Sequence, residues 1–357
     1  MFTYEMLDDL YAYNSWANAK IAALCDGLSD NQLDAKREIG FGTLRATLFH
    51  VLTAERIWME RWTGVPWRPF PTDPDGMTLS EFTNGLAEVA AQRRSLIEIH
   101  RADRWSDQIT YQDSQKTEYT HRLYDLLLHV ANHGVHHRAQ ALQYLKPFER
   151  TLPAGLDYIF YRLAATTVPQ LEESIKGLQA FGLEVATIDA PDPSYDAFMI
   201  LRLFRYHEWA TTELLAMCDT IEVAALDRDF AMGSGSIRKT LLHMMDAEQW
   251  WLNHWSGIDA PFPQSQDDMP LSTIRDVWGQ AAKKRNDFLT SIDPEKSMEV
   301  ITVRPGGPPT SFRVGESALH VALHGTHHRA QVINMLRRSG GRIHDLDLLY
   351  WPALSTS

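Results

Sequence analysis

The chain contains the same histidine-rich octapeptide twice. Residues 133–140 read "HGVHHRAQ" and residues 324–331 read "HGTHHRAQ". Both copies carry a glycine where the surrounding pattern predicts a helix, and a glycine inside a helix destabilises it by about 1 kcal/mol relative to alanine. Because this unfavourable choice recurs with the same neighbours, we interpret the octapeptide as a functional segment that was duplicated.

The repetition extends over nearly the whole sequence. The two copies align at an offset of 193 residues near their beginnings, and the offset falls to 190 near their ends. Each copy is therefore a whole domain rather than a short solenoid repeat. The aligned segments are "YNSWANAKIAALCDGL" (13–28) with "YHEWATTELLAMCDTI" (206–221), "GTLRATLFHVLTAERIW" (42–58) with "GSIRKTLLHMMDAEQWW" (235–251), and "GLDYIFY" (155–161) with "DLDLLYW" (345–351).

The duplication predicts two domains, residues 1–167 and 195–357, joined by residues 168–194. The joining segment has a helical pattern between Pro169 and Phe181, and its Pro- and Asp-rich end is typical of a linker. We therefore expect a connecting helix followed by a flexible linker.

Each copy has four segments with the apolar periodicity of an α-helix. Four helices of similar length are typical of a four-helix bundle, so we expect an all-α fold of two bundles. Alternating residues before the last helix of each copy predict a short β-hairpin. The predicted helices span residues 4–26, 43–63, 79–98 and 123–145 in the first copy, and 195–219, 236–256, 271–291 and 315–338 in the second.

Composition excludes several classes of partner. The net charge of -12 argues against nucleic acid, because binding to phosphates needs clustered Lys and Arg. No apolar run is long enough to span a membrane. The start "MFTYEMLDDL" lacks the basic segment and apolar core of a signal peptide. Cys25 and Cys218 are typical of free thiols in a reducing compartment, so we expect a cytoplasmic protein. With nucleic acid and membrane excluded as partners, the expected substrate is a small molecule.

The last predicted helix of each copy carries three histidines at intervals of four residues. This spacing places them about 6 Å apart along one helix face, and an i, i+4 pair can give two imidazoles to one metal ion. His50 and His243, at matched positions in an earlier helix, would supply a third ligand. A buried histidine is more often a core residue, but a core role would bury several unpaired imidazoles in both copies. The helical histidines are His129, His133 and His137, and His320, His324 and His328.

The spacing alone does not choose the ligands. His133 can pair with His129, with His136 or with His137, and the second copy retains all of these histidines. In each case three protein ligands would leave a fourth coordination position open, as in catalytic rather than structural zinc sites.

The segments "HVANHGVHHRAQ" and "HVALHGTHHRAQ", together with the single earlier histidine and the tryptophan of the first helix, resemble the DinB/YfiT-like superfamily. The resemblance covers each copy nearly end to end. It implies tandem four-helix bundles that form an intrachain pseudo-dimer, because single-domain relatives commonly dimerise. The second copy departs from the pattern at Leu323, where the first has Asn132. The ligands that the resemblance implies are His50, His133 and His137 for one site, and His243, His324 and His328 for the other.

Three residues beside the first copy's ligands recur in the second copy. Gly134 would let a neighbouring helix or a bound substrate approach the site. Gln140 lies three residues beyond His137, within reach of the open coordination position. Arg138 is expected to face solvent or a carboxylate.

An ion with three histidine ligands and an open position suits two chemistries. It can activate water for hydrolysis, which commonly needs a general base nearby, or it can deprotonate a bound thiol. Glu55 and Glu248 lie five residues beyond the earlier histidines, about 140° around the helix, which is a poor position for a base. This favours the thiol.

The resemblance agrees with the thiol, because the superfamily includes transferases and isomerases that depend on low-molecular-weight thiols. We therefore expect a metal-dependent, thiol-dependent S-transferase or isomerase that acts in detoxification or stress response. A metal-dependent hydrolase and a non-catalytic metal- or ligand-binding stress protein are the alternatives. Zinc or nickel is the expected metal, with iron as a further candidate.

Overall fold

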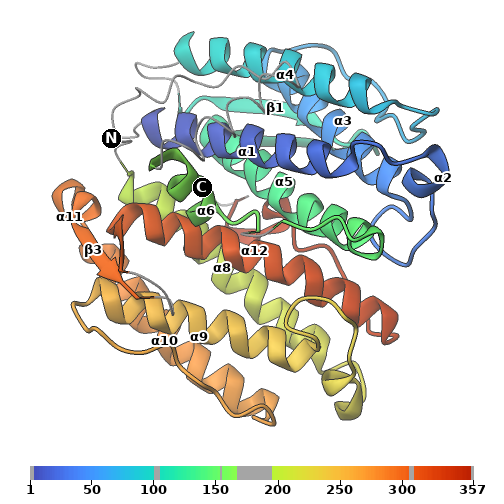
Figure 1. Cartoon of the computed structure of the whole chain (residues 1–357). Helices are drawn as coiled ribbons and strands as arrows, with labels where there is room; N and C mark the ends of the chain where they lie inside the picture. The colour runs from blue at the N-terminus through green and yellow to red at the C-terminus, as the bar shows by residue number, and fades with distance from the viewer. Residues whose placement is uncertain (1–3, 100–104, 153–154, 167–194, 305–308, 355–357) are drawn as a thin grey trace. The chain divides into compact units, whose positions relative to one another are not determined.

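The computed structural model describes residues 4–99, 105–152, 155–166, 195–304 and 309–354. These residues form two compact units, each built mainly of α-helices (Figure 1). The all-α fold is therefore confirmed. The predicted connecting helix and linker, residues 168–194, lie outside the described residues.

The first bundle consists of four long helices. They are α1 (Tyr4–Cys25), α3 (Leu44–Trp62), α4 (Leu79–Ile99) and α5 (Leu123–Leu145). Helix α5 packs against α1 and α3, and α4 packs against the same two helices on the other side. Shorter elements complete this part of the chain: α2 (Asp30–Leu33), β1 (Gln108–Gln112), β2 (Glu118–Arg122), the 3-10 helix η1 (Lys146–Phe148) and α6 (Tyr158–Thr166).

The second bundle repeats this arrangement. Its long helices are α8 (Ala197–Cys218), α9 (Ile237–Trp255), α10 (Leu271–Ser291) and α12 (Val314–Arg338). Helix α12 packs against α8 and α9, as does α10. All eight long helices begin and end within two residues of the predicted bounds. The shorter elements of the second bundle are η2 (Val223–Asp227), α11 (Pro294–Met298), β3 (Val300–Val303) and β4 (Thr310–Arg313). The 3-10 helices η3 (Leu348–Tyr350) and η4 (Pro352–Leu354) follow in sequence.

A β-hairpin precedes the last long helix of each bundle, as predicted. Strands β1 and β2 pair antiparallel, with Tyr111 opposite Tyr119. Strands β3 and β4 pair in the same way, with Val303 opposite Thr310. Each hairpin runs directly into its helix, so the hairpin fixes where the histidine-bearing helix begins.

The same type of cap starts the helix that carries the earlier histidine in both bundles. The Thr43 hydroxyl accepts a hydrogen bond from the amide of Ala46 at 3.1 Å, and the Ser236 hydroxyl accepts one from Lys239 at 3.2 Å. Caps of this kind typically stabilise a helix by about 1 kcal/mol. They place His50 and His243 about two turns into α3 and α9.

A buried polar network joins all four helices of the first bundle. Arg138 on α5 donates to the side-chain oxygen of Asn14 on α1, and Asn14 donates to Glu55 on α3 at 2.9 Å. Arg93 on α4 forms an ion pair with Glu55 at 2.7 Å. All four residues are buried. Removing one partner of a buried ion pair typically destabilises a protein by about 3–5 kcal/mol, so this network specifies how the four helices pack.

The second bundle has an equivalent network in which His207 replaces Asn14. Nη1 of Arg329 lies 2.8 Å from Nδ1 of His207, and Nε2 of His207 lies 3.2 Å from Oε2 of Glu248. Glu248 is also ion-paired with Arg285. The expectation that Arg138 and its counterpart Arg329 face solvent or a carboxylate is therefore wrong. Both are buried and contact an amide oxygen or an imidazole instead, because the carboxylate of each network is taken by the arginine of α4 or α10.

Each compact unit also includes a short segment from the other half of the sequence. Residues Asp157–Ile159 group with the second bundle, and the chain from Asp347 onward groups with the first. The repeat aligns these two segments with each other, so the exchange is reciprocal. Sequence analysis does not foresee it, and the domain boundaries given there stay a prediction.

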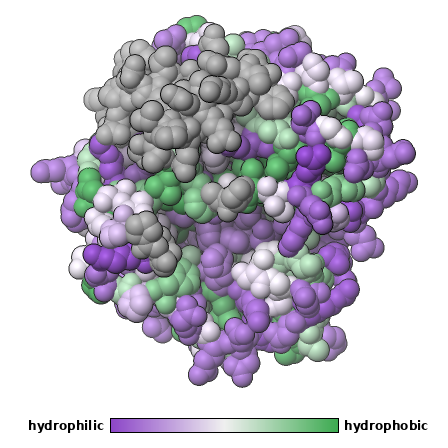
Figure 2. All heavy atoms as spheres, in the orientation of Figure 1, coloured by the Kyte–Doolittle hydropathy of each residue, from purple (hydrophilic) through white to green (hydrophobic). Residues whose placement is uncertain are grey.

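Hydrophilic side chains cover most of the described surface in the view of Figure 2, and hydrophobic residues occur between them in small groups. Among the helices described by the structure, none combines the length and the hydropathy that crossing a bilayer requires.

Candidate metal centre

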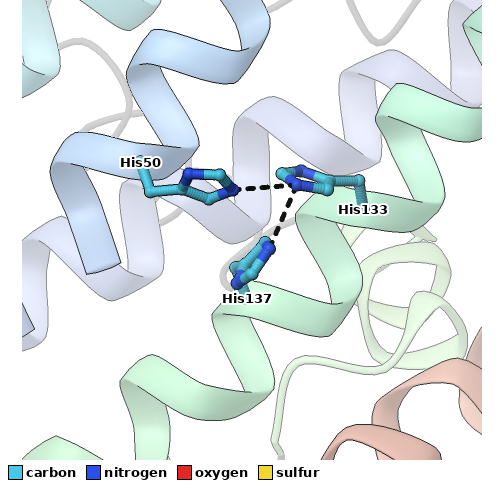
Figure 3. Close-up of side chains that lie close together, drawn as sticks. All are labelled: His50, His133 and His137. Carbon is cyan, nitrogen blue, oxygen red and sulfur yellow. Dashed lines mark hydrogen bonds between the residues drawn. The ribbon is translucent and has the colours of Figure 1, made fainter. Parts of the chain in front are cut away.

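Three imidazoles converge between α3 and α5 of the first bundle. Nε2 of His50 lies 3.0 Å from Nε2 of His133, which lies 3.1 Å from Nε2 of His137 (Figure 3). An ion bound to three imidazoles at about 2.0–2.1 Å in tetrahedral geometry would hold the nitrogens about 3.3 Å apart. The observed spacing differs from this by a few tenths of an ångström, so the three residues could hold a metal ion.

The second bundle forms the same group between α9 and α12. Nε2 of His243 lies 3.1 Å from Nε2 of His324, and the rings of His324 and His328 have centroids 4.4 Å apart. Their ligand atoms also lie close enough together to hold an ion. All six histidines that sequence analysis assigns as ligands are thus brought together, three in each bundle.

The surroundings favour the neutral form of these imidazoles. Burial, followed by the charge of His137, lowers the pKa of His50 to about 3, and burial lowers that of His137 to about 4. Burial together with the neighbouring histidines holds the pKa of His133 well below its usual range. Because metals bind neutral imidazole, each group is ready to act as a ligand near neutral pH. The pKa values of His243, His324 and His328 are lowered as well, with burial as the main cause.

Gln140 selects the tautomer of one ligand. Its Oε1 lies 3.0 Å from Nδ1 of His137, which therefore carries the hydrogen and leaves the lone pair on Nε2. The amide nitrogen of Gln140 lies 2.9 Å from Nε2 of His136. Gln140 therefore orients a ligand from outside, whereas the sequence placed it only within reach of the open coordination position.

The second bundle has the same arrangement. Oε1 of Gln331 lies 2.8 Å from Nδ1 of His328, and its amide nitrogen lies 2.9 Å from Nε2 of His327. The glutamine thus recurs with the same two contacts in both sites. A partner that fixes the tautomer of a ligand commonly contributes a factor of about 10–100 to metal affinity.

The two alternative ligands of the first site have other contacts. Nε2 of His136 is engaged by Gln140. Nδ1 of His129 lies 2.9 Å from Oδ1 of Asp347, and its ring packs against Trp58 with centroids 5.1 Å apart. The structure therefore brings His133 together with His137 and places His129 and His136 beside the group.

The glycine of each octapeptide allows a close approach by another helix. A Cβ at Gly134 would lie 2.6 Å from the side-chain oxygen of Asn14 and 2.6 Å from Nη1 of Arg138. A Cβ at Gly325 would clash with Cε1 of His207. The glycine is needed because the polar network crosses between the helices at this point, which explains why both copies tolerate its low helix propensity.

Asp347 is a residue of the first site that sequence analysis missed. Burial raises the pKa of its carboxyl, but the charge of His129 and the hydrogen bond from that ring outweigh burial and hold the pKa below its usual range. The negative charge of Asp347 in turn offsets part of the lowering that burial imposes on the pKa values of His50 and His137. The available signal was the alignment of 155–161 with 345–351, which pairs Asp347 with Asp157.

Asp157 holds the corresponding place in the second unit. Its charge raises the pKa values of His243, His320 and His328 against the larger, opposite effect of burial. Nδ1 of His320 is buried and has no hydrogen-bond partner within the described part of the chain. Asp157 thus acts on the second group through its charge, and within the described residues no short contact with His320 corresponds to that of Asp347 with His129.

Aromatic rings border the first group more closely than the second. Phe41 is 46% exposed, and its ring centroid lies 4.1 Å from that of His50. Phe70 lies 5.4 Å from the same histidine. In the second bundle Phe262 lies 6.3 Å from His243, and Ser234 occupies the position of Phe41.

Comparison with protein-family models identifies the relatives of the chain. The model described as the DinB family matches residues 1–169 and again residues 194–352. The chain belongs to the DinB family. Its two DinB segments each contain one complete histidine group, which confirms the tandem arrangement inferred from the repeat. Searches of curated proteins and of solved structures gave no match.

Proposed function

We propose that this DinB protein is a metal-dependent enzyme whose two sites activate a low-molecular-weight thiol for reaction with an electrophilic small molecule. The observation that supports it is the convergence of three neutral imidazoles, from two helices, in each bundle. Three protein ligands leave one position for the substrate. His50, His133 and His137 would hold one ion, and His243, His324 and His328 the other.

The nature of the ligands fits a Lewis-acidic centre. Neutral histidines leave the full charge of a divalent ion uncompensated, and imidazole suits zinc, nickel and iron. We propose zinc or nickel as the native metal. When bound, the ion would deprotonate a coordinated thiol outright, so no separate base is required.

The carboxylates repeated within the helices are not available as bases. Glu55 is ion-paired with Arg93, and Glu248 with Arg285. Both glutamates are buried among the four helices of their bundles. This supports the thiol reaction over hydrolysis.

The thiol would come from outside the chain. Burial raises the pKa of Cys25 and of Cys218 to about 12, so neither thiol ionises near neutral pH. A diffusible thiol of the kind maintained in a reducing cytoplasm is the natural cosubstrate. Phe41 and Phe70 beside His50 would favour an electrophile with an apolar group in the first site.

One observation favours a hydrolase as the second candidate. Asp347 and His129 form a carboxylate–imidazole pair beside the first group of histidines. Such a pair could accept a proton from a water molecule in the site. A metal-dependent hydrolase would use this pair, whereas the thiol reaction would not need it.

The test compares the two reactions in protein loaded with zinc or nickel. We expect metal-dependent loss of glutathione with an activated chloronitrobenzene, and loss of that activity when His50→Ala and His243→Ala are combined. His344→Ala is the matched control, because this exposed histidine pairs with Glu213 and lies outside both groups.

Two results would contradict the thiol proposal. Metal-dependent cleavage of an activated ester without thiol, and no reaction with thiol, would indicate the hydrolase. Metal binding that raises the melting temperature, with neither reaction detectable, would indicate a binding protein.

A further inference from the structure

We propose that each metal site is completed by a carboxylate from the end of the other half of the sequence. Asp347, from the second half, positions His129 beside the site of His50 in the first bundle. Asp157, from the first half, groups with the second bundle, and the inference assigns it to the site of His243 there. The inference rests on the proposed metal sites but not on the reaction that they catalyse.

Asp347 is fixed by its own backbone as well as by His129. Its Oδ1 accepts a hydrogen bond from the amide of Leu348 at 2.8 Å, which caps the 3-10 helix η3. Helix η3 packs against α5, the helix that carries His129. The side chain of Asp347 is 18% exposed and that of His129 is 2% exposed. A carboxylate held in this way sets the orientation of a buried ring.

The exchange occurs at the same place in both copies. Tyr13 of α1 donates a hydrogen bond to the carbonyl of Leu156 at 2.9 Å, and Tyr206 of α8 donates to the carbonyl of Leu346 at 2.8 Å. Each leucine is therefore tied to the bundle of its own half. The residue that follows Leu346 is Asp347, which contacts His129 in the first bundle. The residue that follows Leu156 is Asp157, which groups with the second bundle.

Asp347 acts as a positioning residue through His129. With its Oδ1 2.9 Å from Nδ1, the carboxylate favours the form of His129 that carries a hydrogen on Nδ1. It thereby holds the ring beside His133, 5.6 Å away between centroids. Without the carboxylate, Nδ1 would be buried and unpaired, which is unfavourable. The ring could then turn and compete with His137 for the ion, since His129 and His133 also have the i, i+4 spacing.

The test uses full-length protein in which only one metal site remains. Cobalt(II) is the probe, because its visible spectrum reports the geometry of the site as well as its occupancy. Each aspartate is then changed to alanine in each single-site protein. The first-site protein carries His243→Ala and His328→Ala, and the second-site protein carries His50→Ala and His137→Ala.

We expect a crossed pattern of effects. In the first-site protein, Asp347→Ala should weaken cobalt binding about 10-fold, the lower end of the usual range for such contacts, and change the spectrum. Asp157→Ala should change neither there. In the second-site protein Asp347→Ala should change neither property. Asp157→Ala should weaken binding there by less than 10-fold, because no short contact between Asp157 and His320 corresponds to that between Asp347 and His129. Asp347→Asn, which keeps an oxygen acceptor, should restore most of the affinity of the first site.

A second readout needs no metal. In metal-free protein labelled with nitrogen-15 histidine, the imidazole hydrogen shared by His129 and Asp347 should give a downfield signal. That signal should disappear in Asp347→Ala and persist in Asp157→Ala. It separates failure of this inference from failure of the metal proposal, because the contact exists before any ion binds.

Three results would overturn the inference. The first is that each aspartate variant weakens cobalt binding at the site of its own half of the sequence. The second is that both variants weaken both sites equally. The third is that neither variant alters cobalt affinity or the spectrum. If wild-type protein binds no cobalt but the imidazole signal depends on Asp347, the metal proposal fails while the contact between Asp347 and His129 stands. If cobalt binds but neither the signal nor the affinity depends on Asp347, this inference fails while the metal proposal stands.

Discussion

The side-chain oxygen of Gln140 lies 3.0 Å from Nδ1 of His137, and the opposite nitrogen of that ring faces His133. Through this contact Gln140 sets which nitrogen of His137 carries the hydrogen, and so leaves the lone pair of Nε2 directed at the histidine group. It recurs between Gln331 and His328 in the second bundle. Its loss should therefore be visible as a change in metal affinity.

Changing Gln140 to Ala should weaken metal binding at the first site by a factor of about 10 or more, because the tautomer of His137 is no longer fixed. Competition with a chromophoric zinc chelator measures the two affinities of the chain separately. Gln331→Ala is the matched variant and should weaken only the second site. Equal affinities in wild-type and Gln140→Ala protein would contradict this role.

The metal-free protein should lose stability as pH falls from about 6.5 toward 4. The folded-state pKa values of His50 and His137 are about 3 and 4, below the value in the unfolded chain. The unfolded chain therefore binds more protons in this window, and the free energy of unfolding rises with pH. Urea unfolding at several pH values measures it, and His50→Asn should make the dependence shallower. An identical pH dependence in this variant would contradict the prediction.

Gly134→Ala should destabilise the protein by about 1–3 kcal/mol, although alanine is the better helix former. The added Cβ would meet Asn14 and Arg138 of the buried network. Gly279→Ala is the control, because a Cβ at this exposed position of α10 meets nothing within 4 Å. It should stabilise the protein by up to about 1 kcal/mol. Denaturant unfolding distinguishes the two, and a stabilised Gly134→Ala protein would refute the packing argument.

Glu55→Gln should lower the free energy of unfolding by about 3–5 kcal/mol, because Arg93 is left buried without its counter-ion. The folded, metal-loaded fraction should keep its zinc affinity and its thiol reaction, since Glu55 lies in the polar network and outside the histidine group. Thermal melts and assays normalised to bound metal measure the two effects. A folded, metal-bound variant that has lost activity would indicate that Glu55 is a general base.

Much of the fold and of each histidine group could be predicted from the sequence. The apolar periodicity determines the long helices, and the i, i+4 spacing on α5 and α12 limits the candidate ligands to a few. Spacing alone could not choose His137 over His129 as the partner of His133. The choice depends on which face of α3 carries His50 toward α5, and on the contact of His129 with Asp347. Those are long-range features that no local pattern encodes.

The buried arginines and the exchanged aspartates illustrate the same limit. Arg138 follows a charged-surface pattern in the sequence, yet it is buried because Asn14 offers an acceptor from another helix. Asp347 is separated from His129 by 218 residues, more than the length of either predicted domain. Its partner is determined by which bundle the chain end joins, and helix periodicity carries no information about that.

The number of metal ions per chain tests the central claim most directly. Purified protein loaded with saturating zinc or nickel should hold about two ions per chain, one for each histidine group. His50→Ala or His137→Ala should lower the count to about one, whereas His129→Ala and His136→Ala should leave it near two. A drop to one in His129→Ala would identify His129/His133 as the chelating pair. A count of zero in well-folded wild-type protein under every loading condition would contradict the account and return these histidines to the core.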